Sequence, residues 1–363
     1  MKFDRKKYSD KLLKELYLGL QKPRLIEKKM LILLRQGKIS KWFSGIGQEA
    51  ISVGTVAALK EDEYILPMHR NLGIFTGRNI PYEQLFAQWQ GKISGFTKGR
   101  DRSFHFGTNE FNIVGMISHL GPQLAVADGI ALANKIKNEG KVTVAFTGDG
   151  GASEGDFHEA LNVAAVWDLP VIFIVENNGY GLSTPSNEQF KFKQFIDKGP
   201  GYGIEAIQVD GNNVLEVYET VKKVAEKMRK NPKPVLIEAM TFRMRGHEEA
   251  SGTKYVPKEL MEKWGEKDPL RNYEKFLLKE GVITQAYVKE AGEQIIKEIE
   301  EGLAIAYSES IPFGDINEEI SDMYAPFEQV VIAPSSSNTS KKRYVDAISD
   351  GLRQSLEVCQ RFL

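Results

Sequence analysis

Two short turns in the sequence carry oxygen atoms of the kind that bind a divalent cation. The first, Gly148-Asp149-Gly150-Gly151, follows an apolar stretch and supplies a carboxylate. The second supplies the amide oxygen of Asn178, and Gly179 leaves the backbone free to turn the carbonyl of Tyr180 inward. Three protein oxygens leave room for two phosphate oxygens and a water in the octahedral shell of Mg²⁺. We therefore predict that Asp149, Asn178 and Tyr180 bind Mg²⁺.

The glycines of the first turn suit a phosphate group. Gly150 and Gly151 let the backbone approach an anion, and a helix predicted to open at Ser153 presents its N–H groups and positive dipole end to that anion. Ser153 and Asp156 also have the spacing of a capping box, with Asp in place of the usual Glu. A Gly-Asp-Gly turn is common on its own, so the prediction of a metal-bound diphosphate depends on both turns together.

The two turns can meet only if parallel strands bring them together. Short apolar runs, glycine punctuation and helical stretches alternate from Ser44 to about Thr241, which is typical of βαβ units. The runs are continuously apolar, which favours a doubly wound parallel sheet covered by helices on both faces. In such a sheet the turns after neighbouring strands face one crevice. The predicted elements are strands 141–146, 170–175, 205–209 and 235–239 and helices 154–167 and 214–229.

Helical extensions are predicted on both sides of this α/β domain. Residues 1–43 form an N-terminal helical segment, because leucine and isoleucine recur there at helical intervals. The α/β domain with its C-terminal helices spans 44–330, and these helices are expected at 259–264, 268–280 and 284–308. Residues 331–342 are small and polar and are predicted to be a linker. Residues 343–363 begin amphipathic again and form either the start of a further domain or a docking helix.

The composition excludes several classes of protein. Lys and Arg number 48 against 49 Asp and Glu, which gives no electrostatic reason to expect a nucleic-acid partner. The single cysteine, Cys359, excludes an internal disulfide and fits a reducing compartment. No secretory signal and no uninterrupted apolar stretch long enough for a membrane span is readable. We therefore expect a cytoplasmic protein with no membrane partner.

Three motifs together resemble one family. They are Gly148 to Asn162, Glu176 to Ser183, and the stretch from Gly91 to Asp101. The spacing of Gly-Asp-Gly and Asn-Asn matches the fingerprint of enzymes that bind thiamine diphosphate. With the third motif, the sequence resembles the alpha chain of the thiamine diphosphate-dependent first component of 2-oxo acid dehydrogenase complexes, from about Gly45 to Leu278. The resemblance implies the thiamin diphosphate-binding fold.

The resemblance also assigns roles to individual residues. Arg70 matches the arginine that neutralises the diphosphate, and its forked guanidinium suits phosphate better than lysine does. Ser118 and Leu120 match the segment that contacts the aminopyrimidine. His247 matches a catalytic histidine near the diphosphate and the reacting centre, although a surface-loop histidine is an alternative. The full set implied to bind the cofactor is Arg70, Ser118, Leu120, Gly148, Asp149, Gly150, Gly151, Asn178, Tyr180 and His247.

The other histidines are weaker candidates. His69 stands where an aromatic residue is expected before the arginine. A direct role of His119 stays open, His105 is weaker still, and His158 is expected to pack inside its helix.

The function implied by the resemblance is oxidative decarboxylation of a 2-oxo acid and acyl transfer to a lipoyl group. This chain would supply the metal-diphosphate half of the site, and a beta-type chain or domain would supply the glutamate near the pyrimidine. The implied partners also include the lipoyl domain of the acyltransferase component, and the implied assembly is a dimer or an α2β2 heterotetramer. The alternatives are an acetoin dehydrogenase alpha chain and a noncatalytic subunit that binds thiamine diphosphate.

The choice of 2-oxo acid stays open. The stretches 198–204 and 209–213 look closest to enzymes for branched-chain 2-oxo acids, which we favour. Glu176 instead stands where pyruvate enzymes have glutamate. The loop after His247 does not reproduce the phosphorylated loop of animal relatives. The segment 343–363 is similar to the start of a beta chain, which suggests a fused alpha-beta protein.

Overall fold

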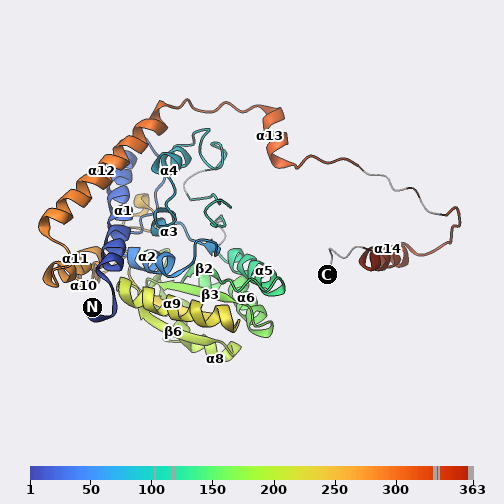
Figure 1. Cartoon of the computed structure of the whole chain (residues 1–363), viewed down its shortest axis with the longest axis horizontal. Helices are drawn as coiled ribbons and strands as arrows, with labels where there is room; N and C mark the ends of the chain where they lie inside the picture. Colours follow the sequence, from blue (N-terminus) through green and yellow to red (C-terminus); the bar gives the residue numbers. More distant parts are fainter. Residues whose placement is uncertain (102–103, 116–119, 330–332, 334–335, 359–363) are drawn as a thin grey trace. The chain divides into compact units, whose positions relative to one another are not determined.

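The computed structural model describes residues 1–101, 104–115, 120–329, 333 and 336–358. The chain divides into two units, Met1–Pro312 and Phe313–Leu363. The first contains a parallel five-stranded sheet in the order β1-β2-β3-β7-β6 (Figure 1). Its strands are β1 (Ile65–Leu66), β2 (Thr143–Gly148), β3 (Val171–Asn177), β7 (Val235–Met240) and β6 (Glu205–Asp210). The predicted α/β class with a parallel sheet is confirmed.

Helices cover both faces of this sheet. On β3, Ile172 and Ile174 belong to one buried cluster, whereas Val171, Phe173 and Val175 belong to another. This alternation follows from the two-residue period of a strand, and burial on both faces explains the continuously apolar sequence. The first cluster includes side chains of α1 (Asp10–Arg35), α2 (Glu49–Ala58), α3 (Leu72–Gly77), α4 (Tyr82–Trp89), α9 (Val214–Lys230) and α12 (Gln285–Ser308); the second includes α5 (Pro122–Ile136) and α6 (Gly155–Val166).

The N-terminal helix α1 is part of the core. Leu13, Leu16 and Tyr17 are buried in a third cluster with Tyr273 and Leu277 of α11 (Pro269–Lys279). Arg24 of α1 pairs with two carboxylates, one of them on α2. The helix predicted from the leucine periodicity therefore anchors the segments that follow it.

The predicted helices and strands agree with the structure to within two residues at most ends. The remaining helices are α10 (Lys258–Gly265), the short α7 (Ser186–Gln189) and α8 (Gly199–Tyr202), and 3₁₀ turns at Arg5–Lys7, Gly151–Ser153, Phe195–Lys198 and Glu249–Ser251. A hairpin of β4 (Tyr180–Gly181) and β5 (Thr184–Pro185) was not predicted. Such two-residue strands carry no readable period.

The predicted cap of one helix is wrong. The helix after the Gly-Asp-Gly turn begins at Gly155, and its cap residue Glu154 makes no side-chain cap hydrogen bond. Gly151–Ser153 instead forms a 3₁₀ turn. The predicted capping box at Ser153 is therefore absent, because the chain uses those residues to complete the turn.

The second unit contains α13 (Ile316–Met323) and α14 (Tyr344–Val358). Helix α14 agrees with the amphipathic stretch expected there. The predicted linker at 331–342 falls partly outside the described residues, and the predicted domain boundaries stay predictions. Among the described residues, no helix combines the length and apolar character needed to cross a bilayer.

Candidate functional site

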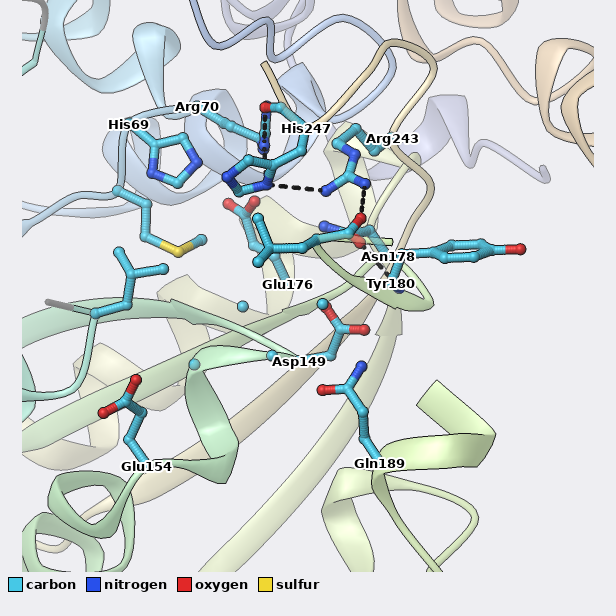
Figure 2. Close-up of a pocket in the computed structure, with 17 residues that line it drawn as sticks. His69, Arg70, Asp149, Glu154, Glu176, Asn178, Tyr180, Gln189, Arg243 and His247 are labelled. Atoms are coloured by element: carbon cyan, nitrogen blue, oxygen red, sulfur yellow. Dashed lines mark hydrogen bonds between the residues drawn. The ribbon is translucent and has the colours of Figure 1, made fainter. Parts of the chain in front are cut away.

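The ends of four parallel strands bring the predicted site residues together. Because β1, β2, β3 and β7 are neighbours, the segments that follow them meet at one edge of the sheet. Arg70 follows β1, Asp149 follows β2, Asn178 follows β3 and His247 lies in the segment after β7. Figure 2 shows these side chains around one pocket.

This pocket is a cavity of about 420 Å³. It holds nearly all of the residues implied by the resemblance, namely Arg70, Leu120, Gly148, Asp149, Gly150, Gly151, Asn178, Tyr180 and His247. Ser118 and His119 lie outside the described residues. His69 also lines the cavity, whereas His105 and His158 do not. The contacts of these two histidines lie elsewhere: His158 is 2.5 Å from the Tyr202 hydroxyl, and His105 pairs with Asp101.

The oxygen atoms of the two turns suit a hard divalent cation. Asp149 is 1% exposed and Asn178 is 7% exposed. Burial raises the pKa of the Asp149 carboxyl, and the hydroxyl of Ser186 donates to its Oδ2 at 2.7 Å. Gly179 has a φ of +82°, which glycine tolerates and which turns the chain back from β3 into Tyr180.

This oxygen set leaves coordination positions for a ligand. Among the described residues, no group of three or more His, Cys, Asp and Glu side chains gathers as a metal centre. The predicted ligands would instead supply one carboxylate, one amide oxygen and one backbone carbonyl. A dication here would need further oxygen ligands, which a diphosphate and water supply.

Two glycines of the first turn pack so closely against neighbouring protein atoms that a side chain would not fit there. A Cβ atom on Gly150 would lie 2.9 Å from the Cα of Gly181, and one on Gly151 would lie 2.7 Å from the Thr147 hydroxyl. Gly148, by contrast, has nothing within 4 Å of such an atom. The steric requirement for glycine is therefore confined to the second and third glycines of the turn.

Two arginines beside His247 form the positive wall of the cavity. Arg70 is 7% exposed and donates to the carbonyls of Ser44 at 3.1 Å and His247 at 2.5 Å. Arg243 is 5% exposed and donates to the Leu182 carbonyl at 2.6 Å. Burial, with the nearby charge of Arg243, lowers the pKa of Arg70 to about 9. Such a pair of buried cations favours an anionic ligand.

The tautomer of His247 follows from its neighbours. Its Nδ1 lies 3.3 Å from Nη2 of Arg70 and 3.4 Å from Nη1 of Arg243. Since both guanidinium groups can only donate, Nδ1 is the acceptor and Nε2 carries the proton. Burial and the two arginines lower the pKa of His247 to about 4, so the ring is neutral near pH 7.

The sequence reasoning missed several residues of the cavity wall. Arg243 and Glu176 are the most consequential, and Met68, Glu154 and Gln189 also line the cavity. Glu176 is fully buried, accepts hydrogen bonds from Asn71 and Gln48, and has its pKa raised to about 7, mainly by burial. The available signal was positional, since Glu176 and Arg243 lie close to the same strand ends as the predicted ligands.

The cavity wall carries charges of both signs. The cavity is lined by three carboxyl groups and two guanidinium groups, on Asp149, Glu154, Glu176, Arg70 and Arg243. With all five ionised the formal charge is one negative, and a divalent cation changes it to one positive. A diphosphate is therefore expected to bind together with the cation.

Comparisons with known proteins show the family of this chain. The family model described as "Dehydrogenase E1 component" matches residues 21–313. The chain is 39% identical over 246 residues to the 2-oxoisovalerate dehydrogenase subunit alpha 1, mitochondrial, of Arabidopsis thaliana, covering 67% of this chain and 52% of that protein. It is 40% identical over 251 residues to the corresponding alpha subunit of Caenorhabditis elegans, covering 68% and 58%.

The human relative covers a longer stretch. The mitochondrial 2-oxoisovalerate dehydrogenase subunit alpha of Homo sapiens is 36% identical over 293 residues, covering 80% of this chain and 65% of that protein. The matched stretches span about half to two thirds of these relatives. The family match spans the sheet and every described residue of the cavity, so the predicted relationship to alpha subunits is confirmed, and this chain belongs to the dehydrogenase E1 component family.

Proposed function

We propose that this chain binds thiamine diphosphate through Mg²⁺ and provides the metal-diphosphate half of a 2-oxo acid dehydrogenase site. The observation that carries the proposal is the meeting of Arg70, Asp149, Asn178 and His247 at four adjacent strand ends around one cavity. The resulting wall combines hard oxygen ligands, backbone close to the ligand and two buried cations. These are the features that a metal-bound diphosphate requires.

The roles of the residues follow from their chemistry. Asp149, Asn178 and the Tyr180 carbonyl would hold Mg²⁺, and the backbone at Gly150 and Gly151 would lie against the diphosphate. Arg70 and Arg243 would neutralise its remaining charge, with Leu120 on the pyrimidine side. Gly148 would contribute backbone at the end of β2, and Ser118 keeps its role as a prediction. Thiamine diphosphate, when bound, supplies a carbon nucleophile and an electron sink for loss of CO₂ from a 2-oxo acid.

His247 would act as the catalytic histidine of this half-site. Its Nδ1 is held by the two arginines, which leaves the Nε2 proton as the group that can be donated. The ring is neutral near pH 7, so it can donate a hydrogen bond and hold a proton at Nε2 without adding a third positive charge.

For the substrate we favour a branched-chain 2-oxo acid, with pyruvate next. The matched relatives carry the name 2-oxoisovalerate dehydrogenase, which supports the first. Glu176 lines the cavity at the position where, by the sequence resemblance, pyruvate enzymes have glutamate, which supports pyruvate.

The proposed partners are a beta-type chain or domain that completes the site, and the lipoyl domain of the acyltransferase component. The proposed assembly is a dimer or an α2β2 heterotetramer. A cytoplasmic location stays a prediction, since the matched relatives are named mitochondrial.

The test is turnover of a panel of 2-oxo acids with thiamine diphosphate, Mg²⁺, an artificial electron acceptor and a supplied beta half. The panel contains pyruvate, 2-oxobutyrate, 2-oxoisovalerate and 2-oxoisocaproate, with acetoin added. We expect decarboxylation only with the beta half present, fastest for a branched-chain acid and lost in Asp149→Ala. The control is Asp62→Ala, an exposed aspartate that does not line the cavity.

Three outcomes would replace the proposal. Turnover of acetoin alone would favour an acetoin dehydrogenase. Cofactor binding without any turnover would favour a noncatalytic subunit. Absence of cofactor binding by calorimetry, with the beta half present, would remove the thiamine diphosphate site altogether.

A further inference from the structure

The side chain of Ser186 makes a hydrogen bond to a residue that is distant in the sequence. Its hydroxyl donates to Oδ2 of Asp149 at 2.7 Å, across 37 residues of sequence. Ser186 is the first residue of the four-residue helix α7, whose cap residue Pro185 makes no side-chain cap bond. The hydroxyl is therefore not used to cap its own helix.

The backbone of the same residue contacts the second turn of the site. The Ser186 N–H donates to the carbonyl of Gly179 at 3.0 Å. In the adjoining hairpin, Tyr180 pairs with Pro185 and Gly181 with Thr184. Ser186 thus connects the turn that carries Asp149 to the turn that carries Tyr180.

Gln189 closes the same segment from the other end of α7. Its Nε2 donates to the Thr184 carbonyl at 2.9 Å, and its amide lies so close to Gly181 that a Cβ there would meet Oε1 at 2.7 Å. Figure 2 shows Gln189 beside Asp149. The segment from Thr184 to Gln189 is therefore held against both turns by its own hydrogen bonds.

We propose that Ser186 is a positioning residue for the metal site, an inference that rests on the proposed function. The terminal torsion of an aspartate side chain is broad and roughly two-fold, so an unrestrained carboxylate samples many orientations. The Ser186 hydroxyl holds Oδ2 and adds to the backbone hydrogen bonds that Asp149 and Gly150 donate to the same carboxyl. Its N–H at the same time holds the carbonyl of Gly179, which fixes the turn before Tyr180. Groups that orient metal ligands in this way contribute to metal affinity without touching the metal.

The experiment measures binding of Mn²⁺ to the full chain, with the beta half and thiamine diphosphate present, by electron paramagnetic resonance of the free ion. The variants are Ser186→Ala, which removes the hydroxyl, and Ser186→Thr, which retains it. Asp149→Ala removes the ligand itself. Ser183→Ala is the matched control, because Ser183 is an exposed serine three residues earlier in the same hairpin. Each variant is also melted without ligands.

We expect Ser186→Ala to raise the apparent Kd for Mn²⁺ by about 10- to 100-fold, the range typical of lost outer hydrogen bonds to metal ligands. Ser186→Thr should restore affinity to within about threefold, and Ser183→Ala should bind as the wild type does. The threonine rescue separates positioning of the carboxylate from a general loss of structure.

The outcomes distinguish this inference from the function on which it rests. Loss of Mn²⁺ binding in Asp149→Ala with unchanged binding in Ser186→Ala would overturn the role of Ser186 and leave the proposed function intact. Weak binding in both Ser186→Ala and Ser186→Thr would also overturn it. Equal binding by the wild type and Asp149→Ala, or no binding by the wild type, would overturn the proposed function and the inference with it.

Discussion

Replacing Arg243 by methionine is expected to separate the stability of this protein from its affinity for the cofactor. Arg243 is buried and lies beside Arg70, with both guanidinium groups directed at Nδ1 of His247. Removing a buried charge that has a charged partner ordinarily costs about 3–5 kcal/mol. Arg243 has no ion-pair partner among the described residues and its charge repels that of Arg70, so Arg243→Met should behave differently.

The size of the effect on the ligand-free protein follows from the geometry. The two facing guanidinium nitrogens of Arg70 and Arg243 are at most about 6.7 Å apart, the sum of their distances to Nδ1, so their repulsion is about 2.5 kcal/mol at an effective dielectric constant of about 20. Methionine removes this repulsion. It also removes the hydrogen bonds to the Leu182 carbonyl and the Tyr255 hydroxyl, which costs about 1–3 kcal/mol. The two effects largely offset each other, so the free energy of unfolding should change by no more than about 1.5 kcal/mol in either direction.

The affinity for thiamine diphosphate, by contrast, should fall clearly. A hydrogen bond from a guanidinium to a charged group contributes about 1.5–3 kcal/mol. Losing one should raise the Kd for thiamine diphosphate by about 10- to 100-fold at saturating Mg²⁺. Affinity should fall while the ligand-free protein keeps its stability.

The assay combines urea unfolding of the ligand-free chain with isothermal calorimetry of thiamine diphosphate in the presence of the beta half. The control is Arg245→Met, two residues away, because Arg245 pairs with Glu249 and does not line the cavity. The control should leave the Kd unchanged.

Two results would refute this reasoning. A loss of 3 kcal/mol or more in ligand-free Arg243→Met would mean that the charge of Arg243 is already compensated in the folded protein. An unchanged Kd would mean that Arg243 does not face the anion.

Three further predictions rest on other parts of the structure. The pKa of His247 is about 4 in the folded protein, below the usual unfolded value of about 6.5. The neutral ring therefore contributes stability that is present above pH 6.5 and is lost as the pH falls towards 4. Nuclear magnetic resonance titration of the ring should place its midpoint near pH 4. Gly151→Ala should destabilise the chain by about 1–3 kcal/mol in urea, because the new Cβ would meet the Thr147 hydroxyl at 2.7 Å, whereas Gly155→Ala has open space and should not. Arg24→Met should cost about 3–5 kcal/mol in the same assay, since it leaves two partly or fully buried carboxylates without their cation, and a change below 1 kcal/mol would contradict the pairing.

The sequence alone determined the local chemistry of this protein. Asp149, Asn178 and Tyr180 could be selected because hard oxygen ligands and glycine punctuation occur within single turns, where chain order fixes the neighbours. The strands β2 and β3 were readable because burial on both faces gives continuously apolar runs. The turns that carry these residues were predicted to face each other under one condition, namely that their strands are neighbours in the sheet. The structure satisfies it, since Gly148 lies in register with Glu176.

Tertiary structure decided the features that depend on residues far apart in the chain. The pairing of β3 with β7, rather than with β6, which comes first in the chain, brings Arg243 and His247 to the cavity, and nothing local in either strand specifies that partner. The same holds for the contact of Ser186 with Asp149. The protonation states of His247 and Glu176 were also unreadable, because a pKa depends on burial and on charges contributed by other strands. The sequence therefore named the predicted ligands of the site, and the fold determined the charges and hydrogen bonds that surround them.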